Sequence, residues 1–255
     1  MRTSNWAITE SVEGNYLRAC REASLSELEF ARFKKNSSYQ VILEHLSRED
    51  GEYYLSCIGD SEILSSNLKA FSENDLYGGA DVQEYAGVSL SPSTIKYIKN
   101  SLDILSLVGE GVHLGRIVEI GGGYGGLAKT LSVVLDFDEY ISIDQPEANL
   151  LSEKYISKFP ELSAKFKTHS CYEYPKIDVV DLVISNYALS ELDLESQYEY
   201  CDNIIVNSKF IYVTYNLIIA DHIKSLQQRI GESYLWEIEP ERDHGNKILY
   251  GKRNG

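Results

Sequence analysis

The chain has 255 residues, of which 43% are hydrophobic and 25% are charged, a composition that excludes intrinsic disorder. This length accommodates one doubly wound domain of about 150 residues together with an extension. Acidic residues outnumber basic ones by 39 to 24, and the formal net charge is −15. A field of this sign repels phosphate backbones and anionic membranes, so we expect no nucleic-acid or membrane partner. A local pocket for one nucleotide-linked small molecule remains compatible with this charge.

Cysteine spacing and hydropathy favour a cytoplasmic protein. The four cysteines, Cys20, Cys57, Cys171 and Cys201, are far apart and lack the paired spacing of a zinc site or a redox motif. The first residues lead into charged, helix-like sequence without the apolar core of a signal peptide. No run of about 18 apolar residues occurs anywhere, so we expect no transmembrane helix.

The first 90 residues are expected to form a helical cap that contributes to the site of the second substrate. Residues 11–46 are polar and punctuated by leucines, which predicts two helices, and Gly51-Glu52 is expected to end this helical stretch. A further helix is predicted over Ser61–Phe71. The glycine-punctuated stretch that includes Tyr77 is expected to be a loop, with Tyr77 in a mobile lid.

The second part of the chain, residues 91–255, has the pattern of an α/β domain. Ser91-Pro92 is typical of an N-cap followed by proline at the first helical position, and apolar residues recur at helical spacing from Ile95 to Val108. Short apolar runs then alternate with helical stretches, which indicates βα units on a parallel sheet. Strands are expected at Arg116–Ile120, Glu139–Ile143, Lys165–Thr168, Asp181–Ser185 and Phe210–Tyr215.

The end of the chain is organised differently from the βα units. Two strand-like runs, Tyr234–Glu239 and Lys247–Lys252, are joined by a short polar stretch with no helix between them. This pattern predicts an antiparallel hairpin that closes the parallel sheet. Nicotinamide-binding Rossmann domains continue instead with another crossover.

A glycine-rich turn joins the first of these strands to the next helix, with the sequence Val-Glu-Ile-Gly-Gly-Gly-Tyr-Gly-Gly over residues 118–126. Glycines let the backbone approach a ligand closely, and the helix N-terminus beyond them offers free N–H donors. Gly121, Gly123 and Gly126 match G-x-G-x-x-G, so a nicotinamide or flavin cofactor has to be considered. Glu119 adds nothing to pyrophosphate binding but suits an amine. With Glu119, the turn resembles motif I of class I S-adenosylmethionine-dependent methyltransferases.

The resemblance implies a Rossmann-like α/β fold, with a seven-stranded, mostly parallel sheet, the C-terminal antiparallel hairpin and an N-terminal helical extension. It implies S-adenosylmethionine as the cofactor, with Asp144 accepting hydrogen bonds from two ribose hydroxyls. The alternative role of Asp144 is a helix N-cap before Pro146. Cys171 is equally well explained as a packing residue, and Asn186 as a turn residue at a strand end. The implied cofactor contacts are Glu119, Gly121, Gly123, Tyr124, Asp144, Gln145, Ser170, Cys171 and Asn186.

The run Ser-Asn-Tyr-Ala-Leu-Ser-Glu-Leu over residues 185–192 resembles bacterial sugar O-methyltransferases, many of them linked to capsule or surface-glycan synthesis. The resemblance implies methyl transfer to a hydroxyl of a sugar or nucleotide-sugar. A base must take the hydroxyl proton, and Glu191 and His244 are the candidates. A solvated helix carboxylate and a surface-loop histidine are their alternatives. Tyr77, Tyr187 and Ser190 are the candidate substrate-binding residues.

Two other functions remain open at this stage. A small-molecule N-methyltransferase needs the same alignment of acceptor and methyl group but no strong base. A scaffold protein that kept the fold without activity has no affinity for the cofactor. The sequence contains no compact acidic cluster, so we expect no metal, and it leaves a homodimer open.

Overall fold

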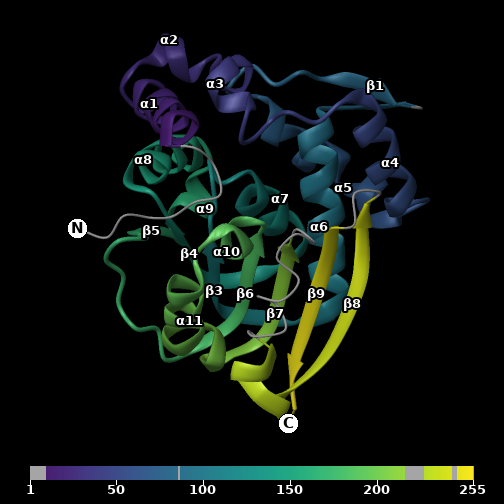
Figure 1. Ribbon diagram of the computed structural model, residues 1–255. Helices are drawn as coiled ribbons and strands as arrows, with labels where there is room; N and C mark the ends of the chain where they lie inside the picture. The colour runs from purple at the N-terminus through teal and green to yellow at the C-terminus, as the bar shows by residue number, and fades with distance from the viewer. Residues whose placement is uncertain (1–9, 86, 216–226, 243–245, 255) are drawn as a thin grey trace.

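The computed structural model describes residues 10–85, 87–215, 227–242 and 246–254, shown in Figure 1. The N-terminal part contains several short helices and one small hairpin, and the rest alternates strands with helices until the final hairpin. The elements are α1 (Glu10–Leu25), α2 (Glu27–Phe30), η1 (Phe33–Lys35), α3 (Ser37–Gln40), α4 (Arg48–Ile58), α5 (Glu62–Ser72), η2 (Glu73–Asp75), β1 (Gln83–Tyr85), β2 (Val88–Leu90), α6 (Pro92–Val108), β3 (His113–Ile120), α7 (Gly126–Val134), β4 (Asp136–Asp144), α8 (Pro146–Ile156), α9 (Pro160–Ser163), β5 (Phe166–Ser170), β6 (Val180–Asn186), α10 (Ala188–Glu191), α11 (Leu194–Asn203), η3 (Ile205–Asn207), β7 (Ser208–Tyr215), η5 (Gly231–Ser233), β8 (Tyr234–Arg242) and β9 (Asn246–Arg253).

The main sheet has seven strands in the order β5-β4-β3-β6-β7-β9-β8. The first five of these are parallel to their neighbours, whereas β9 is antiparallel to both β7 and β8. Two antiparallel steps bring β8 back into the direction of β7, so the carboxyl end of β8 lies at the same edge as the carboxyl ends of the parallel strands. The predicted strands, the C-terminal hairpin and the fold class are therefore confirmed.

Helices cover both faces of this sheet, so its central strands β3 and β6 are largely buried and mostly apolar. Side chains alternate between the faces, and Ile117 and Val118 belong to two different hydrophobic clusters. The first cluster lies under α6, α7 and α8 and the second under α10 and α11, as the arrangement in Figure 1 shows. None of the described helices is long and apolar enough to cross a membrane.

The helix predicted to begin at Ser91 is present as α6. The Ser91 hydroxyl accepts a hydrogen bond from the Thr94 N–H at 3.2 Å, and Pro92 is the first helical residue. The helix predicted over Ser61–Phe71 is present as α5, with Ser61 as its N-cap. Both predicted helices are confirmed, and the capping pattern at Ser91-Pro92 predicted the start of α6 correctly.

Other predictions for the first 90 residues were wrong in detail. The stretch 11–46 forms three α-helices and a 3-10 helix, not two helices. Gly51 does not end a helix but lies inside α4. Glycine is needed there because a Cβ at this position would lie 2.3 Å from the Tyr85 hydroxyl oxygen. The stretch expected to be a loop contains the β1–β2 hairpin, to which Tyr85 belongs. Gly51 is therefore a packing glycine and not a helix breaker.

The N-terminal elements lie over the carboxyl edge of the sheet, above β3, β4 and β6 in Figure 1. Helix α1 packs against α8, and α4 packs against α6. Buried residues of α1, such as Cys20, share one hydrophobic cluster with Leu151 of α8. The described N-terminal elements, α1 to β2, therefore cover the edge at which the glycine turn and the strand ends meet.

Candidate functional site

The glycine turn after β3 is packed tightly on several sides. Gly121 has a φ of +80°, and a Cβ at this residue would lie 2.2 Å from the Cβ of Ala188. A Cβ at Gly122 would lie 2.2 Å from the Ser142 hydroxyl oxygen. At Gly123 the φ is +56°, and a Cβ would lie 2.8 Å from a methyl carbon of Leu43. Glycine is thus required here both by conformation and by the close approach of α10, β4 and the N-terminal segment.

Asp144 ends β4 and is bonded to the glycine turn. Its Oδ2 accepts a hydrogen bond from the Gly123 N–H at 2.8 Å, and its Oδ1 accepts one from the Gln145 N–H at 2.7 Å. Burial raises the pKa of the carboxyl to about 6, although these two hydrogen bonds oppose the shift. The N-cap residue of α8 is Gln145, so Asp144 does not have the alternative N-cap role.

Glu119 lies directly behind the turn and is 2% exposed. Its Oε2 accepts a hydrogen bond from the Tyr140 hydroxyl at 2.6 Å and lies 3.1 Å from where a Cβ of Gly122 would be. Burial raises the pKa of this carboxyl to about 8, the Tyr140 hydrogen bond lowers it, and the nearby Asp144 raises it further. Glu119 and Asp144 are therefore neighbours, but Asp144 alone of the two lines the adjoining cavity.

A cavity of about 530 Å³ runs along the carboxyl edge of the sheet. Its wall includes Gly121, Gly123, Asp144 and Gln145 on the side of the glycine turn, and Glu241 and Asn246 on the side of the C-terminal hairpin. The segment 41–46 forms part of the wall contributed by the first 90 residues. The cavity is thus shared between the α/β domain and its N-terminal cover.

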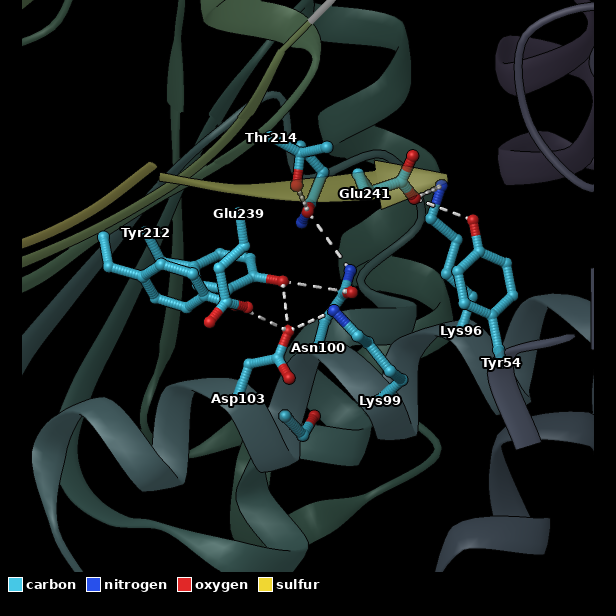
Figure 2. Close-up of polar contacts among 12 residues, drawn as sticks. Tyr54, Lys96, Lys99, Asn100, Asp103, Tyr212, Thr214, Glu239 and Glu241 are labelled. Atoms are coloured by element: carbon cyan, nitrogen blue, oxygen red, sulfur yellow. Dashed lines mark hydrogen bonds and ion pairs between the residues drawn. The ribbon is translucent and has the colours of Figure 1, made fainter. Parts of the chain in front are cut away.

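Asn186 lines the middle of this edge, where β6 ends. Its Oδ1 accepts hydrogen bonds from Asn100 Nδ2 at 3.2 Å and from the Thr214 hydroxyl at 3.1 Å. Asn100 is in turn bonded to Tyr212, which also donates to Asp103, as Figure 2 shows. With Oδ1 occupied in this way, the amide nitrogen of Asn186 is left as a donor toward the cavity.

The residue after Asn186 has a strained backbone. Tyr187 has a φ of 69° and a ψ of −39°, while its N–H donates to the Thr214 carbonyl at 2.8 Å. Among the described residues, Glu44 is the other non-glycine residue with positive φ, and both line the cavity. Residues with positive φ persist where the surrounding structure holds them, and they cluster at functional sites.

A buried carboxylate lies at the hairpin end of the cavity. Glu241 is 5% exposed and accepts hydrogen bonds from the Tyr54 hydroxyl at 2.7 Å and the Tyr187 hydroxyl at 2.6 Å. The Lys96 ammonium lies 3.4 Å from its Oε1, and Figure 2 shows Tyr54, Lys96 and Glu241 converging from separate elements. We call Tyr54, Lys96, Tyr187 and Glu241 the Glu241 cluster.

The charges of the Glu241 cluster stabilise one another. Burial raises the pKa of the Glu241 carboxyl, but Lys96 and the two tyrosine hydroxyls more than offset this, so the pKa lies below its usual value. Burial lowers the pKa of the Lys96 ammonium, and Glu241 partly opposes the shift. Sequence reasoning missed Tyr54, Lys96 and Glu241. No short-range signal marked them, because the three residues come from α4, α6 and β8, which are far apart in the sequence.

Of the two candidate bases, Glu191 lines the cavity. Burial raises the pKa of its carboxyl above the usual value for glutamate. His244 lies outside the described residues. Within the described parts of the chain, no group of three or more His, Cys, Asp or Glu side chains is placed to hold a metal ion.

Several of the other candidate side chains lie away from the cavity wall. The Tyr124 ring is buried against Phe33 and Tyr155, and Tyr77 packs against Phe30, Tyr155 and Phe159 in the same aromatic group. Ser190 is buried, and its hydroxyl donates to the Tyr187 carbonyl at 2.7 Å.

Ser170 is the last residue of β5 and pairs with Asp144 at the end of β4, and Cys171 follows it. The Ser170 hydroxyl accepts a hydrogen bond from the Tyr172 N–H at 3.2 Å, and the Cys171 N–H donates to the Asp144 carbonyl at 2.9 Å. Gln145 lines the cavity and accepts a hydrogen bond from the Tyr172 hydroxyl at 2.8 Å. These residues border the Asp144 end of the site.

No protein-family model and no curated protein matches the sequence. Solved structures do match the fold. The N-terminal domain of EvdMO1 with S-adenosylhomocysteine (SAH) bound aligns with a TM-score of 0.51 and 10% identity over 74% of this chain and 97% of that one. The same domain in the presence of SAH and D-fucose aligns with a TM-score of 0.51 and 11% identity over the same shares. A protein from Methanococcus maripaludis, proposed to be an S-adenosyl-L-methionine-dependent methyltransferase, aligns with a TM-score of 0.48 and 17% identity over 62% of this chain and 86% of its own. The seven-stranded sheet with its terminal hairpin is thus the Rossmann-like fold of S-adenosylmethionine-dependent methyltransferases.

Proposed function

We propose that this protein transfers a methyl group from S-adenosylmethionine to a hydroxyl of a small polar acceptor, a sugar or nucleotide-linked sugar of capsule or surface-glycan synthesis. The observation that carries the proposal is the single cavity with two chemically different ends. One end has the glycine turn and Asp144, and the other has Glu191 and the Glu241 cluster. A transferase needs such an arrangement, because donor and acceptor have to be aligned in one enclosed space.

The Asp144 end fits the cofactor. Asp144 offers carboxylate oxygens for ribose hydroxyls, Asn186 offers an amide donor, and Gly121 lines the cavity beside them. Ser170 and Cys171 adjoin Asp144, and they are the proposed contacts of the adenine ring. When bound, S-adenosylmethionine supplies an electrophilic methyl group. The EvdMO1 domain of the same fold binds SAH, which supports this choice of cofactor.

The opposite end suits a hydroxylated acceptor. The Glu241 cluster brings two tyrosine hydroxyls with their rings, a lysine ammonium and a carboxylate together in a buried setting. Sugars bind through this combination of polar groups and rings. D-fucose was present with SAH in one EvdMO1 structure, which supports a sugar as the class of acceptor.

Glu191 is the proposed general base. A sugar hydroxyl has to lose its proton as the new bond to carbon forms, so a carboxylate with a raised pKa is better suited than an ordinary glutamate. Glu191 also lies one turn of helix after Tyr187, on the same wall as the Glu241 cluster. His244, which lies outside the described residues, remains a second proposed base.

Calorimetry followed by product analysis tests the proposal. The full chain is titrated with SAH, and is then incubated with S-adenosylmethionine and a panel of free sugars, nucleotide-sugars and amino sugars. We expect SAH binding, and a methylated product whose new methyl group is attached to oxygen. A protein that binds no SAH is a scaffold without activity, whereas a methyl group on nitrogen identifies an N-methyltransferase.

A further inference from the structure

Glu44 is an unusual residue of the N-terminal cover. It follows α3 in the segment 41–46, has a φ of 62°, and lines the cavity. The preceding residue, Leu43, packs against Gly123 of the glycine turn. A glutamate in the left-handed region is strained, so the surrounding structure holds the backbone of Glu44 in place in the cavity wall.

One oxygen of the Glu44 carboxyl lacks a hydrogen-bond donor among the described residues. Its Oε1 is buried and has no hydrogen-bond partner in the described structure. Burial raises the pKa of the carboxyl, while Lys34 and the hydroxyls of Tyr124 and Ser93 oppose the shift without cancelling it. The Lys34 ammonium itself donates to the Asn74 carbonyl at 2.8 Å and lies over the Tyr124 ring. A buried carboxylate oxygen without a donor costs free energy that a bound ligand can recover.

The charge of the cavity wall favours a ligand with a positive group. Among the described residues of the wall, carboxyl groups outnumber amino groups, and the lysine there, Lys96, is already paired with Glu241. The carboxyl-bearing residues of the wall are Glu44, Asp50, Asp144, Glu191 and Glu241.

We propose that Glu44 binds the ammonium group of the amino-acid part of the cofactor, from the N-terminal cover and beside the glycine turn. This inference rests on the proposed function. An ammonium has N–H donors that match an unpartnered carboxylate oxygen, whereas a sulfonium has none. The ribose hydroxyls are matched by Asp144 at the strand end. Glu119, the other acidic residue near the turn, is bonded to Tyr140 and does not line the cavity.

The test compares three ligands by calorimetry on the full chain: SAH, its desamino analogue, and 5′-methylthioadenosine, which lacks the amino acid altogether. We expect Glu44→Gln to weaken SAH binding by roughly 10- to 100-fold, the usual effect of losing one hydrogen bond between charged groups. Affinities for the desamino analogue and 5′-methylthioadenosine should stay within about twofold of wild type. Glu62→Gln, an exposed carboxyl in the first turn of α5, is the matched control and should alter none of the three.

The other outcomes separate the inference from the proposed function. A wild-type protein that binds none of the ligands removes the proposed function, and the inference with it. If wild type binds SAH and Glu44→Gln binds it equally well, only the role of Glu44 is refuted. An equal loss for all three ligands also refutes it, because Glu44 then acts on the nucleoside or on the fold. Should Glu44→Gln not fold, Glu44→Asp keeps the charge with a shorter reach and should weaken SAH selectively.

Discussion

The replacement Asp144→Asn separates the proposed ribose contact from the structural role of this residue. Asn is close in shape and keeps one acceptor oxygen, but it turns the second oxygen into an amide donor. In the folded protein, the carboxylate accepts two backbone hydrogen bonds, from Gly123 and Gln145. Only one of these can be kept by Asn. The exchange therefore affects both the glycine turn and any hydroxyl that the carboxylate binds.

We expect Asp144→Asn to change the stability of the protein only slightly and to weaken its affinity for SAH strongly. Losing one backbone hydrogen bond costs about 1–3 kcal/mol. Replacing a carboxylate that burial disfavours offsets much of this cost, so the free energy of unfolding should change by about 1 kcal/mol or less. Binding loses a charge-assisted hydrogen bond to a ribose hydroxyl, about 1.5–3 kcal/mol, which corresponds to roughly 10- to 100-fold in affinity for SAH.

Calorimetry with SAH and urea unfolding measure the two effects on the same preparations. Asp178→Asn, an exposed aspartate paired only with Lys176 at 3.6 Å, is the control and should leave SAH affinity unchanged. The pH dependence gives a second check. Because the pKa of Asp144 is raised to about 6, its carboxylate is protonated as the pH falls through this value, and wild-type affinity should decline there. In Asp144→Asn the affinity should not follow this decline. A folded Asp144→Asn protein with wild-type affinity for SAH would refute the ribose assignment.

Three further predictions concern the acceptor end and the turn. Glu191→Gln should lower turnover about 100- to 10,000-fold, measured by steady-state rates, and should leave SAH affinity unchanged, measured by calorimetry. Turnover of the wild-type protein should rise with pH through a pKa above the usual glutamate range. Glu241→Gln should reduce the free energy of unfolding by about 3–5 kcal/mol, because it leaves the buried Lys96 ammonium unpaired. Adding Lys96→Met should restore part of that loss in urea unfolding, and no recovery would argue against the ion pair. Gly121→Ala should cost about 1–2 kcal/mol for its positive φ. Overlap with Ala188 should add about 1–3 kcal/mol, and Ala188→Gly should relieve only this second part.

The parallel sheet could be predicted because its signals are local. The strands of the βα units, the N-cap at Ser91 and the turn glycines are each recognised within a short window of sequence. Gly51 shows where this reasoning fails. A glycine in a polar stretch reads as a helix end, yet in the folded protein it is required by the Tyr85 ring, 34 positions further along the chain. Tertiary packing had overridden the local preference.

The direction in which a side chain points could not be predicted from the sequence either. Tyr124 lies within the glycine turn, so a contact with the cofactor was expected, but its ring is buried against Phe33 and Tyr155. Tyr77 lies beside two glycines, and it too packs into this aromatic group and not over the cavity. A turn sequence indicates where the backbone passes, whereas the direction of each ring depends on the N-terminal helices that cover the turn.

The two ends of the cavity differ in how far apart their residues are in the sequence, and this explains why one end was predicted and the other missed. Gly121, Gly123 and Asp144 come from consecutive strand ends of one sheet, whose carboxyl ends have to meet at the same edge. Tyr54 and Glu241 are 187 residues apart and meet only because α4 packs on α6 while the terminal hairpin returns β8 to that edge. The Asp144 end therefore follows from the sheet alone. The Glu241 end, which is the proposed acceptor site, depends on how α4 and α6 pack beside the hairpin.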